Sequence, residues 1–572
     1  MRKVKTPLIT GVLLTLLTTV SVQAKSKTNT MNAVWNANGV QTQSRQKTKM
    51  TRADYQARYK KQQAEAKLNR QRAAWRKKWE AEQRAKKRKT TSAKRAKRTS
   101  IKKPAYATYR SQKIPATYNR LPISIISKLN ARGVGEYGIS AYVRDVNSPK
   151  PLLAYQDETA RVPASVMKLI TSYASLGILG PNYRWPLDVY TQGSIRNGTL
   201  QGNLYIKGYG SPEFNREELR KVLRGIRQKG IRNISGRIVF DNTYFNSASK
   251  YHGAFDSKSQ VAYNAKPDAL LFNKRLNSFQ IRAVGKRVVV NNLTPTHNLK
   301  IVNKMRKTRR SCRPRISVSK RAGLTTVTFR GKYSRRCGTR TYTRVISEPA
   351  NMIYGTMRSM WKQEVGGRLN THFAMGQVPR NARPLLRTYS RTLAQILPTI
   401  DKNSNNVMAR QLLLSIGAKA SRGRGTERNG AKAIARWLAS RGLNFPELRI
   451  ENGSGLSRTA RISARHVSDL LIDAYRSPYR NVLMQALAVA GVDGTMKRRL
   501  RSTPVRGRGY FKTGTLRDVR SIAGYVKAAN GKTYVMAILH NDPKAPHRAL
   551  AAHDKLIEWV FEGGGRQQLA MR

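Results

Sequence analysis

The fold of this chain is decided by the stretch Arg161-Val162-Pro163-Ala164-Ser165-Val166-Met167-Lys168-Leu169-Ile170-Thr171. Its proline suits the first turn of a helix, and Ser165 and Lys168 are then expected on one helical face, within reach of each other. A serine hydroxyl is protonated at neutral pH, and a desolvated lysine whose pKa has fallen can remove that proton. The pair predicts a nucleophile beside a candidate base. In a chain with 111 Lys and Arg, however, Ser-x-x-Lys also arises by chance, so further motifs are needed.

Two more motifs follow in order along the chain. Ser404-Asn405-Asn406 stands directly before a helical pattern, and Lys512-Thr513-Gly514-Thr515 precedes two alternating apolar runs, residues 521–526 and 534–539. A turn at residues 529–531 joins these runs, which predicts a hairpin. The order Ser-x-x-Lys, Ser-x-Asn, Lys-Thr-Gly is shared by serine β-lactamases and penicillin-binding proteins.

The wider sequence resembles the class C low-molecular-mass penicillin-binding proteins, the D-alanyl-D-alanine carboxypeptidase/endopeptidase family. A predicted hairpin, residues 137–143 and 152–155, leads to the serine motif, and more than 200 residues separate Lys168 from Ser404, as in family members with large insertions. The segments 202–208, 272–274, 451–458 and 491–495 are also similar to the family. One departure is Gly210-Ser211-Pro212, where the family commonly has Gly-Asp-Pro. The resemblance spans about residues 121–561 and leaves the basic N-terminal region uncovered.

The resemblance implies an α/β fold like that of β-lactamases and penicillin-binding transpeptidases, with an antiparallel sheet flanked by helices and largely β inserted domains. We expect the catalytic domain at residues 121–189 and 349–572. Residues 190–348 alternate Val, Ile, Tyr and Phe runs with Asn and Gly turns, which predicts mostly β inserted domains. Cys312 and Cys337 are the only cysteines, and in an exported protein they are expected to form a disulfide. No nearby histidine pair completes a metal site, and neither metal nor cofactor is expected.

The N-terminal part of the chain differs in composition from the rest. Residues 1–24 combine a basic start, an apolar core and a small-residue cleavage position, which predicts a signal peptide and a periplasmic protein; an uncleaved anchor is the alternative. Residues 45–103 hold 24 Lys and Arg against four acids. Residues 25–120 are therefore expected to be disordered or to form a lone solvated helix. The net charge of +82 suggests the hypothesis that this region binds anionic envelope polymers. The alternative interpretation is that the region is a passive linker.

The resemblance also implies a mechanism. Ser165 is expected to attack the carbonyl between the two terminal D-alanines of peptidoglycan stem peptides, forming an acyl-enzyme that water hydrolyses. The backbone N–H groups of Ser165 and Thr515 are expected to hold the oxyanion. Ser404 relays a proton to the leaving amine and Asn406 holds the substrate amide. β-Lactam antibiotics are expected to acylate Ser165.

The strand of the third motif is expected to bind the substrate's free carboxylate. Lys512 supplies positive potential, and Thr513 and Thr515, on either side of Gly514, supply hydroxyl donors. Either Lys168 or Lys512 can serve as the base, because each lysine's charge depresses the other's pKa. The sequence leaves this choice open, together with the choice between carboxypeptidase and endopeptidase.

Other classes of function find less support in the sequence. The chain has no Gly-x-Ser-x-Gly elbow, no His-Glu-x-x-His and no Walker loop, and its seven histidines are scattered. A non-catalytic, polycationic cell-envelope binding protein is the alternative, and the three complete motifs argue against it. High charge alone suggests nucleic-acid binding, but the predicted export argues against that partner.

Overall fold

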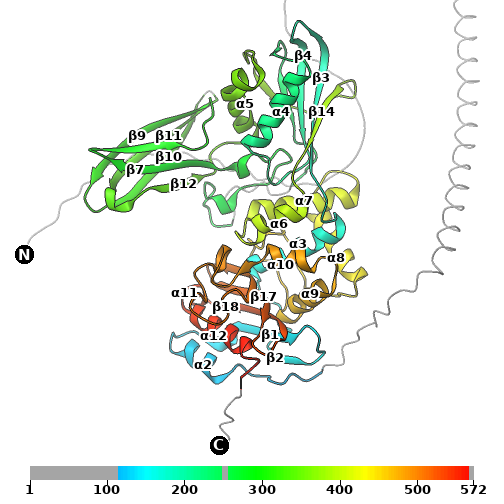
Figure 1. Cartoon of the computed structure of the whole chain (residues 1–572), viewed down its shortest axis with the longest axis vertical. Helices are drawn as coiled ribbons and strands as arrows, with labels where there is room; N and C mark the ends of the chain where they lie inside the picture. Colours follow the sequence, from blue (N-terminus) through cyan, green and yellow to red (C-terminus); the bar gives the residue numbers. More distant parts are fainter. Residues whose placement is uncertain (1–113, 248–254, 322, 566–572) are drawn as a thin grey trace, which may run out of the picture. The chain divides into compact units, whose positions relative to one another are not determined.

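The computed structural model describes residues 114–247, 255–321 and 323–565 (Figure 1). The predicted signal peptide at residues 1–24 and most of the basic region at residues 25–120 lie outside the described residues. Within the described ranges, no helix is both long and apolar enough to cross a membrane.

One sheet forms the centre of the part that carries the three motifs. Its strands are β1 (Ile139–Asp145), β2 (Pro151–Tyr155), β15 (Ala488–Val489), β16 (Gly509–Leu516), β17 (Val519–Lys527) and β18 (Thr533–Asn541). They pair antiparallel in the order β15-β16-β17-β18-β1-β2. Both hairpins expected from sequence alternation, at β1–β2 and β17–β18, are present. Because side chains alternate along a strand, Val535 and Ala537 of β18 face one core and Met536 and Ile538 face the other.

Helices cover both faces of this sheet. On the side that carries the serine motif, α9 (Ala464–Arg476) packs against the sheet. The same core also includes α3 (Met167–Ile178), α6 (Leu393–Asp401), α7 (Asn406–Ser421), α8 (Glu427–Ser440) and α10 (Arg480–Ala486). The opposite face packs against α2 (Ile123–Asn130), α11 (Ala545–Arg548) and α12 (Leu550–Phe561). Ser463 caps α9, because its hydroxyl accepts a hydrogen bond from the N–H of His466 at 3.2 Å.

A second sheet builds the first inserted domain. Its elements are β3 (Pro186–Arg196), β4 (Thr199–Gly208), β5 (Asn233–Ile234), β6 (Ile238–Asp241), β13 (Phe373–Met375) and β14 (Arg383–Tyr389), with helices α4 (Arg216–Gln228) and α5 (Pro349–Val365). The strand order is β13-β6-β4-β3-β14, with β5 beside β4. Leu223 and Ile226 of α4 share a core with Met357 and Trp361 of α5.

The inserted part therefore extends beyond the boundary expected at residue 348. Helix α5 and strands β13 and β14 all follow that boundary, yet they complete the second sheet and its core. The backbone N–H of Trp185 donates to Oγ of Ser390 at 3.0 Å, where the chain enters and leaves the insertion. The apolar face of a helix does not by itself show against which core that face packs. Residues 349–389 thus pack with the inserted part rather than with the catalytic core.

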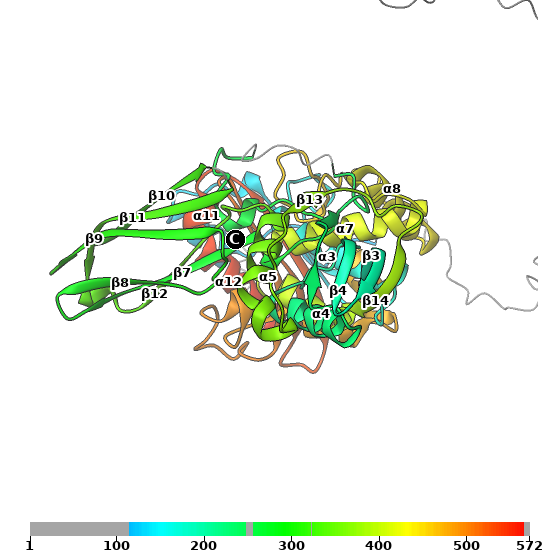
Figure 2. The ribbon, with the colours of Figure 1, turned by 90° about the horizontal axis from the view of Figure 1, so that it is seen from above.

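Two three-stranded sheets complete the insertion. One contains β7 (Asn277–Val284), β8 (Arg287–Asn292) and β12 (Arg340–Arg344), and the other contains β9 (Leu299–Thr308), β10 (Cys312–Arg321) and β11 (Leu324–Ser334). Figure 2 shows them as two layers. Phe279 and Ile281 of one sheet pack against Val327 and Phe329 of the other. The sulfurs of Cys312 and Cys337 are bonded, at 2.00 Å, and tie β10 to the segment after β11.

Short 3-10 helices fill several connections. They are η1 (Glu136–Gly138), η2 (Ala164–Val166), η3 (Ala262–Asn264), η4 (Asn273–Arg275), η5 (Arg335–Cys337) and η6 (Gly494–Met496).

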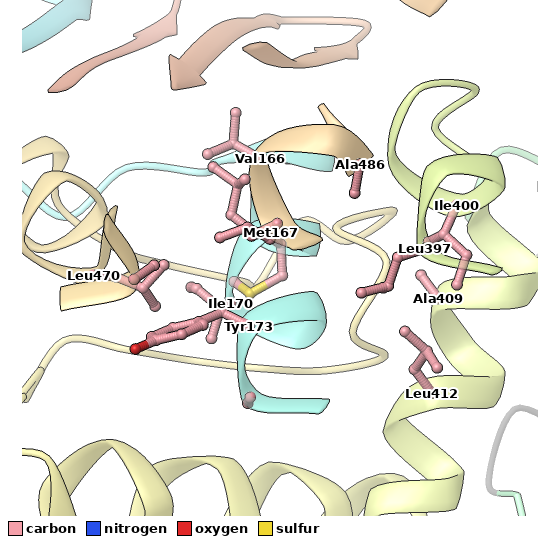
Figure 3. Close-up of a cluster of buried hydrophobic side chains, with 14 of the residues drawn as sticks. Val166, Met167, Ile170, Tyr173, Leu397, Ile400, Ala409, Leu412, Leu470 and Ala486 are labelled. Carbon is pink, nitrogen blue, oxygen red and sulfur yellow. The ribbon is translucent and has the colours of Figure 1, made fainter. Parts of the chain in front are cut away.

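The serine motif rests on a packed apolar core (Figure 3). Buried side chains from four segments meet there: Val166, Met167, Ile170 and Tyr173 from the serine motif and α3, Leu397 and Ile400 from α6, Leu412 from α7, and Leu470 from α9. Burying a side chain of this size stabilises the fold by about 1.5–3 kcal/mol. This packing fixes the start of α3, and with it the position of Ser165.

Candidate active site

The candidate nucleophile lies in a tight turn rather than in a regular α-helix. Pro163 leads into the 3-10 helix η2, which contains Ser165, and α3 begins only at Met167. Ala164 has φ +48°, a left-handed conformation that is strained for a residue with a side chain. Ser165 is half-buried, and its Oγ is 3.0 Å from Nζ of Lys168. The predicted pair is therefore in contact. Its serine lies in η2, just before the first residue of α3.

The lysine of this pair is completely buried and has three partners. Nζ of Lys168 contacts Oγ of Ser165, Oδ1 of Asn406 at 2.7 Å and the carbonyl oxygen of Ser454 at 2.6 Å. Burial is the main cause that lowers the pKa of Lys168 well below its usual range, and the positive charge of Lys512 lowers it further. A neutral amine has two N–H donors and one lone pair. If the two N–H groups donate to the two carbonyl oxygens, the lone pair is left for the Ser165 hydroxyl.

The second motif lies at the start of α7, between the two lysines; its Asn406 is the first residue of that helix. Ser404 has φ +52°, and its Oγ accepts a hydrogen bond from Nζ of Lys512 at 2.9 Å. Asn405 caps α7 through the N–H of Met408, at 3.2 Å. The amide of Asn406 accepts from Lys168 and donates to the carbonyl oxygen of Tyr263 at 3.1 Å. Since Tyr263 belongs to η3, the insertion contributes a contact to the site.

The third motif lies on β16, against the serine turn. Lys512 is buried, and its Nζ also donates to the carbonyl oxygen of Thr513 at 2.8 Å. Burial lowers the pKa of Lys512 to about 8, although the charge of Asp401 opposes this effect. A Cβ added at Gly514 would lie 2.8 Å from the carbonyl oxygen of Pro163 and 3.0 Å from the N of Ser165. Only glycine allows β16 to approach the nucleophile this closely.

The threonines of the third motif flank this glycine. The hydroxyl of Thr513 donates to Oγ1 of Thr495 at 2.8 Å, and Thr495 belongs to η6. Thr515 is exposed, and its Oγ1 accepts a hydrogen bond of 3.4 Å from Arg520. Hydroxyl and guanidinium groups such as these, near the exposed Thr515 of β16, are donors that can hold a carboxylate.

A buried acid, Asp401, ends α6 three residues before Ser404 of the second motif. Burial raises its pKa to about 6, while Lys512, the Ser172 hydroxyl and Lys168 act to lower it. Among the described residues, neither carboxylate oxygen has a partner with hydrogen-bond geometry. Asp401 thus interacts with both lysines of the site through charge alone.

The profile of the D-Ala-D-Ala carboxypeptidase 3 (S13) family matches residues 128–560. The chain belongs to this family. Members of the family act on peptidoglycan peptides and bind β-lactams. The resemblance inferred from the three motifs is therefore confirmed.

Individual members of the S13 family are distant relatives of this chain. The D-alanyl-D-alanine carboxypeptidase of Actinomadura sp. (strain R39) is 27% identical over 423 residues, which cover 71% of this chain and 78% of the relative. The D-alanyl-D-alanine carboxypeptidase DacB of Haemophilus influenzae is 23% identical over 403 residues, which cover 68% and 82%.

The structural comparison shows the fold. The crystal structure of penicillin binding protein 4 from Haemophilus influenzae matches with a TM-score of 0.65 at 20% identity, covering 77% of this chain and 100% of that chain. A structure of the same protein complexed with a novel β-lactam matches with a TM-score of 0.62. The S13 chain thus has the fold of penicillin binding protein 4, mixed α/β with several additional sheets, as the sequence predicted.

Sequence reasoning did not assign every group that contacts the motifs of this S13 protein. The carbonyl oxygen of Ser454 was missed because a backbone atom has no signature of its own. Its two flanking glycines were the available signal: Gly455 has φ +77°, and a Cβ there would lie 1.8 Å from the carbonyl oxygen of Ala164. Asp401 was missed although it is an acid on the buried face of an apolar helix, four residues after Leu397. The contact from Tyr263 depends on the insertion and has no local signal.

Proposed function

We propose that this S13 protein is a serine DD-peptidase that hydrolyses D-alanyl-D-alanine bonds of peptidoglycan peptides through an acyl-enzyme on Ser165. The observation that carries the proposal is the environment of Lys168. A buried amine of lowered pKa has two carbonyl acceptors and stands 3.0 Å from the serine oxygen. Such an amine can take the proton from Ser165 as Oγ attacks the substrate carbonyl. This favours Lys168 over Lys512 as the base for acylation.

The other motifs supply the remaining steps. The N–H groups of Ser165 and Thr515 hold the negative oxygen of the tetrahedral intermediate. Its collapse breaks the carbon–nitrogen bond, and the leaving amine needs a proton. Ser404 can deliver one, because its hydroxyl is hydrogen-bonded to the ammonium of Lys512. Water then attacks the ester carbonyl and gives its proton through Ser404 back to Lys512, and Ser165 leaves with the proton returned from Lys168.

The third motif, on β16, recognises the terminal carboxylate. With a pKa of about 8, Lys512 is mostly protonated at neutral pH. Its charge, with the hydroxyls of Thr513 and Thr515, attracts the carboxylate of the last D-alanine. A penicillin presents a carboxylate and a reactive carbonyl in a similar arrangement, so it acylates the same oxygen.

Labelling with a fluorescent penicillin tests the proposal. We expect a covalent adduct with the wild-type chain and none with Ser165→Ala, since only the attacking oxygen is removed. Ser127→Ala, at an exposed position on α2, is the matched control and should label normally. Undiminished labelling of pure Ser165→Ala protein would remove Ser165 from its role. Incubation with a pentapeptide monomer and with a crosslinked dimer then separates carboxypeptidase from endopeptidase activity.

The N-terminal proposals concern export and attachment. The composition of residues 1–24 supports export to the periplasm, and the cations of residues 25–113 support electrostatic attachment to anionic envelope polymers. Deleting residues 25–113 should weaken co-sedimentation with isolated envelopes at low salt and leave penicillin labelling unchanged. Equal sedimentation of both forms would favour a passive linker.

A further inference from the structure

The two small sheets of the insertion have an unusual charge balance. From residue 269 to residue 347 the sequence contains 21 Lys and Arg and no Asp or Glu. This stretch is folded: it contains β7 to β12 and the bond between Cys312 and Cys337. Its cations therefore have fixed positions that can be traced strand by strand.

Six of these cations form two rows across one sheet face. Strand β11 pairs antiparallel with β10 and parallel with β9, and residues in register point to the same side. The first row is Arg313, Lys332 and Arg306, and the second row is Arg315, Arg330 and Lys304. We call these six residues the cation grid. All six are exposed.

The opposite side of the same strands explains why the grid faces outward. Ile316 of β10, Val327 and Phe329 of β11, and Ile301 of β9 pack into the core shared with the other small sheet. Because side chains alternate along a strand, residues of the other parity must point away from that core. Figure 2 shows β9, β10 and β11 as one layer, with β7, β8 and β12 on a single side of it.

The grid is electrostatically uncompensated. Among the described residues, no ion pair or side-chain hydrogen bond engages any of its six cations. Like charges directly opposite each other on neighbouring strands destabilise a sheet. Neighbouring strands are about 4.8 Å apart, and residues two apart on a strand are separated by about 6.7 Å. Six positive charges thus share a patch about 10 Å by 7 Å, whose charge an anionic ligand would balance.

We propose that the cation grid is a docking surface for a membrane surface that exposes phosphate groups. The grid extends in two dimensions on a pleated face, which suits an array of headgroups better than a single linear chain. Four of its six cations are arginines, whose planar forks pair with phosphate oxygens. Next to it the same face carries the hydroxyls of Ser317, Ser319, Thr326 and Thr328. Neither row nor these neighbours include an aromatic side chain, whereas surfaces for single-stranded nucleic acid use aromatic side chains for stacking.

The expected effect of the grid follows from its charge. Each Lys or Arg near an anionic lipid surface strengthens binding by about fivefold. Neutralising one row of three should therefore weaken partition onto anionic vesicles by about a hundredfold. Other cations of the chain also contribute, so the comparison must be with a variant of equal net charge.

The test uses the full chain and vesicles of phosphatidylcholine, with or without phosphatidylglycerol. The grid variant is Lys304→Gln/Arg315→Gln/Arg330→Gln. The control is a triple variant on α8, where three exposed cations lie four residues apart: Arg428→Gln/Lys432→Gln/Arg436→Gln. Both variants lose two arginines and one lysine. We expect the grid variant to lose about a hundredfold in partition onto anionic vesicles, and the control to lose much less.

Several results would overturn the proposal. An equal loss in both triple variants would mean that net charge, not this face, binds the vesicles. Unchanged vesicle partition, with loss of binding to soluble polyphosphate or to isolated sacculi, would assign the face to a polymer instead. The grid variant should unfold at the same temperature as wild type or higher, because opposed like charges are removed. If it fails to fold, Arg306→Gln/Arg313→Gln/Lys332→Gln neutralises the neighbouring row and must give the same loss.

Discussion

Replacing Asp401 with asparagine removes a buried negative charge and keeps the shape of the side chain. The charge of Asp401 acts to raise the pKa of both Lys168 and Lys512, so the pKa of each lysine should fall in Asp401→Asn. An opposite charge within about 4–6 Å shifts a pKa by about 1–3 units. We expect about one unit, the low end, because the carboxylate oxygens make no hydrogen bond to either lysine.

The consequence for penicillin acylation depends on pH. In the wild type Lys512, with a pKa of about 8, is half protonated at pH 8. A fall of about one unit leaves about a tenth protonated at that pH, so attraction of the penicillin carboxylate and the acylation rate should drop about fivefold. Asp401 itself has a pKa of about 6 and is largely neutral below that pH. The two rate profiles should therefore converge below about pH 6.

The second-order rate of acylation by a fluorescent penicillin, measured from about pH 5 to pH 9, tests this reasoning. Asp145→Asn, at the last residue of β1, is the matched control and should follow the wild-type profile. An unchanged basic limb in Asp401→Asn would mean that the carboxylate does not act on Lys512. A rate difference that persists undiminished at pH 5 would indicate structural damage rather than loss of charge.

Three further predictions follow from other parts of the structure. Gly514→Ala should slow acylation by about tenfold or more, since its Cβ would push β16 from the nucleophile; Gly135→Ala, where a Cβ meets nothing within 4 Å, should leave the rate unchanged. His540 is buried beside His553, and burial lowers its pKa to about 4. As pH falls from about 6.5 to 4, His540 binds a proton in the unfolded chain but not in the folded chain. The free energy of unfolding should therefore fall by up to about 3 kcal/mol. Urea midpoints over this range should show the loss, which His540→Asn should reduce; a flat midpoint in the wild type contradicts the assignment. Replacing both cysteines with serine should destabilise the two small sheets by about 3 kcal/mol, seen as faster amide exchange in β9 to β12, without slowing acylation; equal exchange in both forms would show that the bond adds nothing to their stability.

The catalytic motifs and the central sheet were predictable because their signals are local. A serine and a lysine three residues apart lie together on any helical turn, and alternating apolar residues at 534–539 indicate a strand whichever strand pairs with it. The family resemblance, which the profile match confirms, was carried by the same short segments.

Domain boundaries, and contacts between residues distant in sequence, were harder to predict from the sequence. Helix α5 has the same amphipathic pattern in either domain, and only pairing between β14 and β3 shows that residues 349–389 complete the inserted sheet. The contacts of Lys168 with Asn406 and Ser454 span 238 and 286 residues of sequence. Neither a backbone carbonyl nor a buried acid such as Asp401 can be assigned to a site before the chain folds around it.

The sequence by itself determined the order of the three motifs, the candidate nucleophile with two lysines, the β character of the insertion and the excess of positive charge. Tertiary structure alone decided which lysine has the two carbonyl acceptors that leave its lone pair for Ser165. It also decided that cations from β9, β10 and β11 meet in rows on one face. The physical reason is the same in both cases. Secondary structure depends on the spacing of neighbouring residues, whereas burial, pKa and charge clustering depend on the register in which distant segments pack.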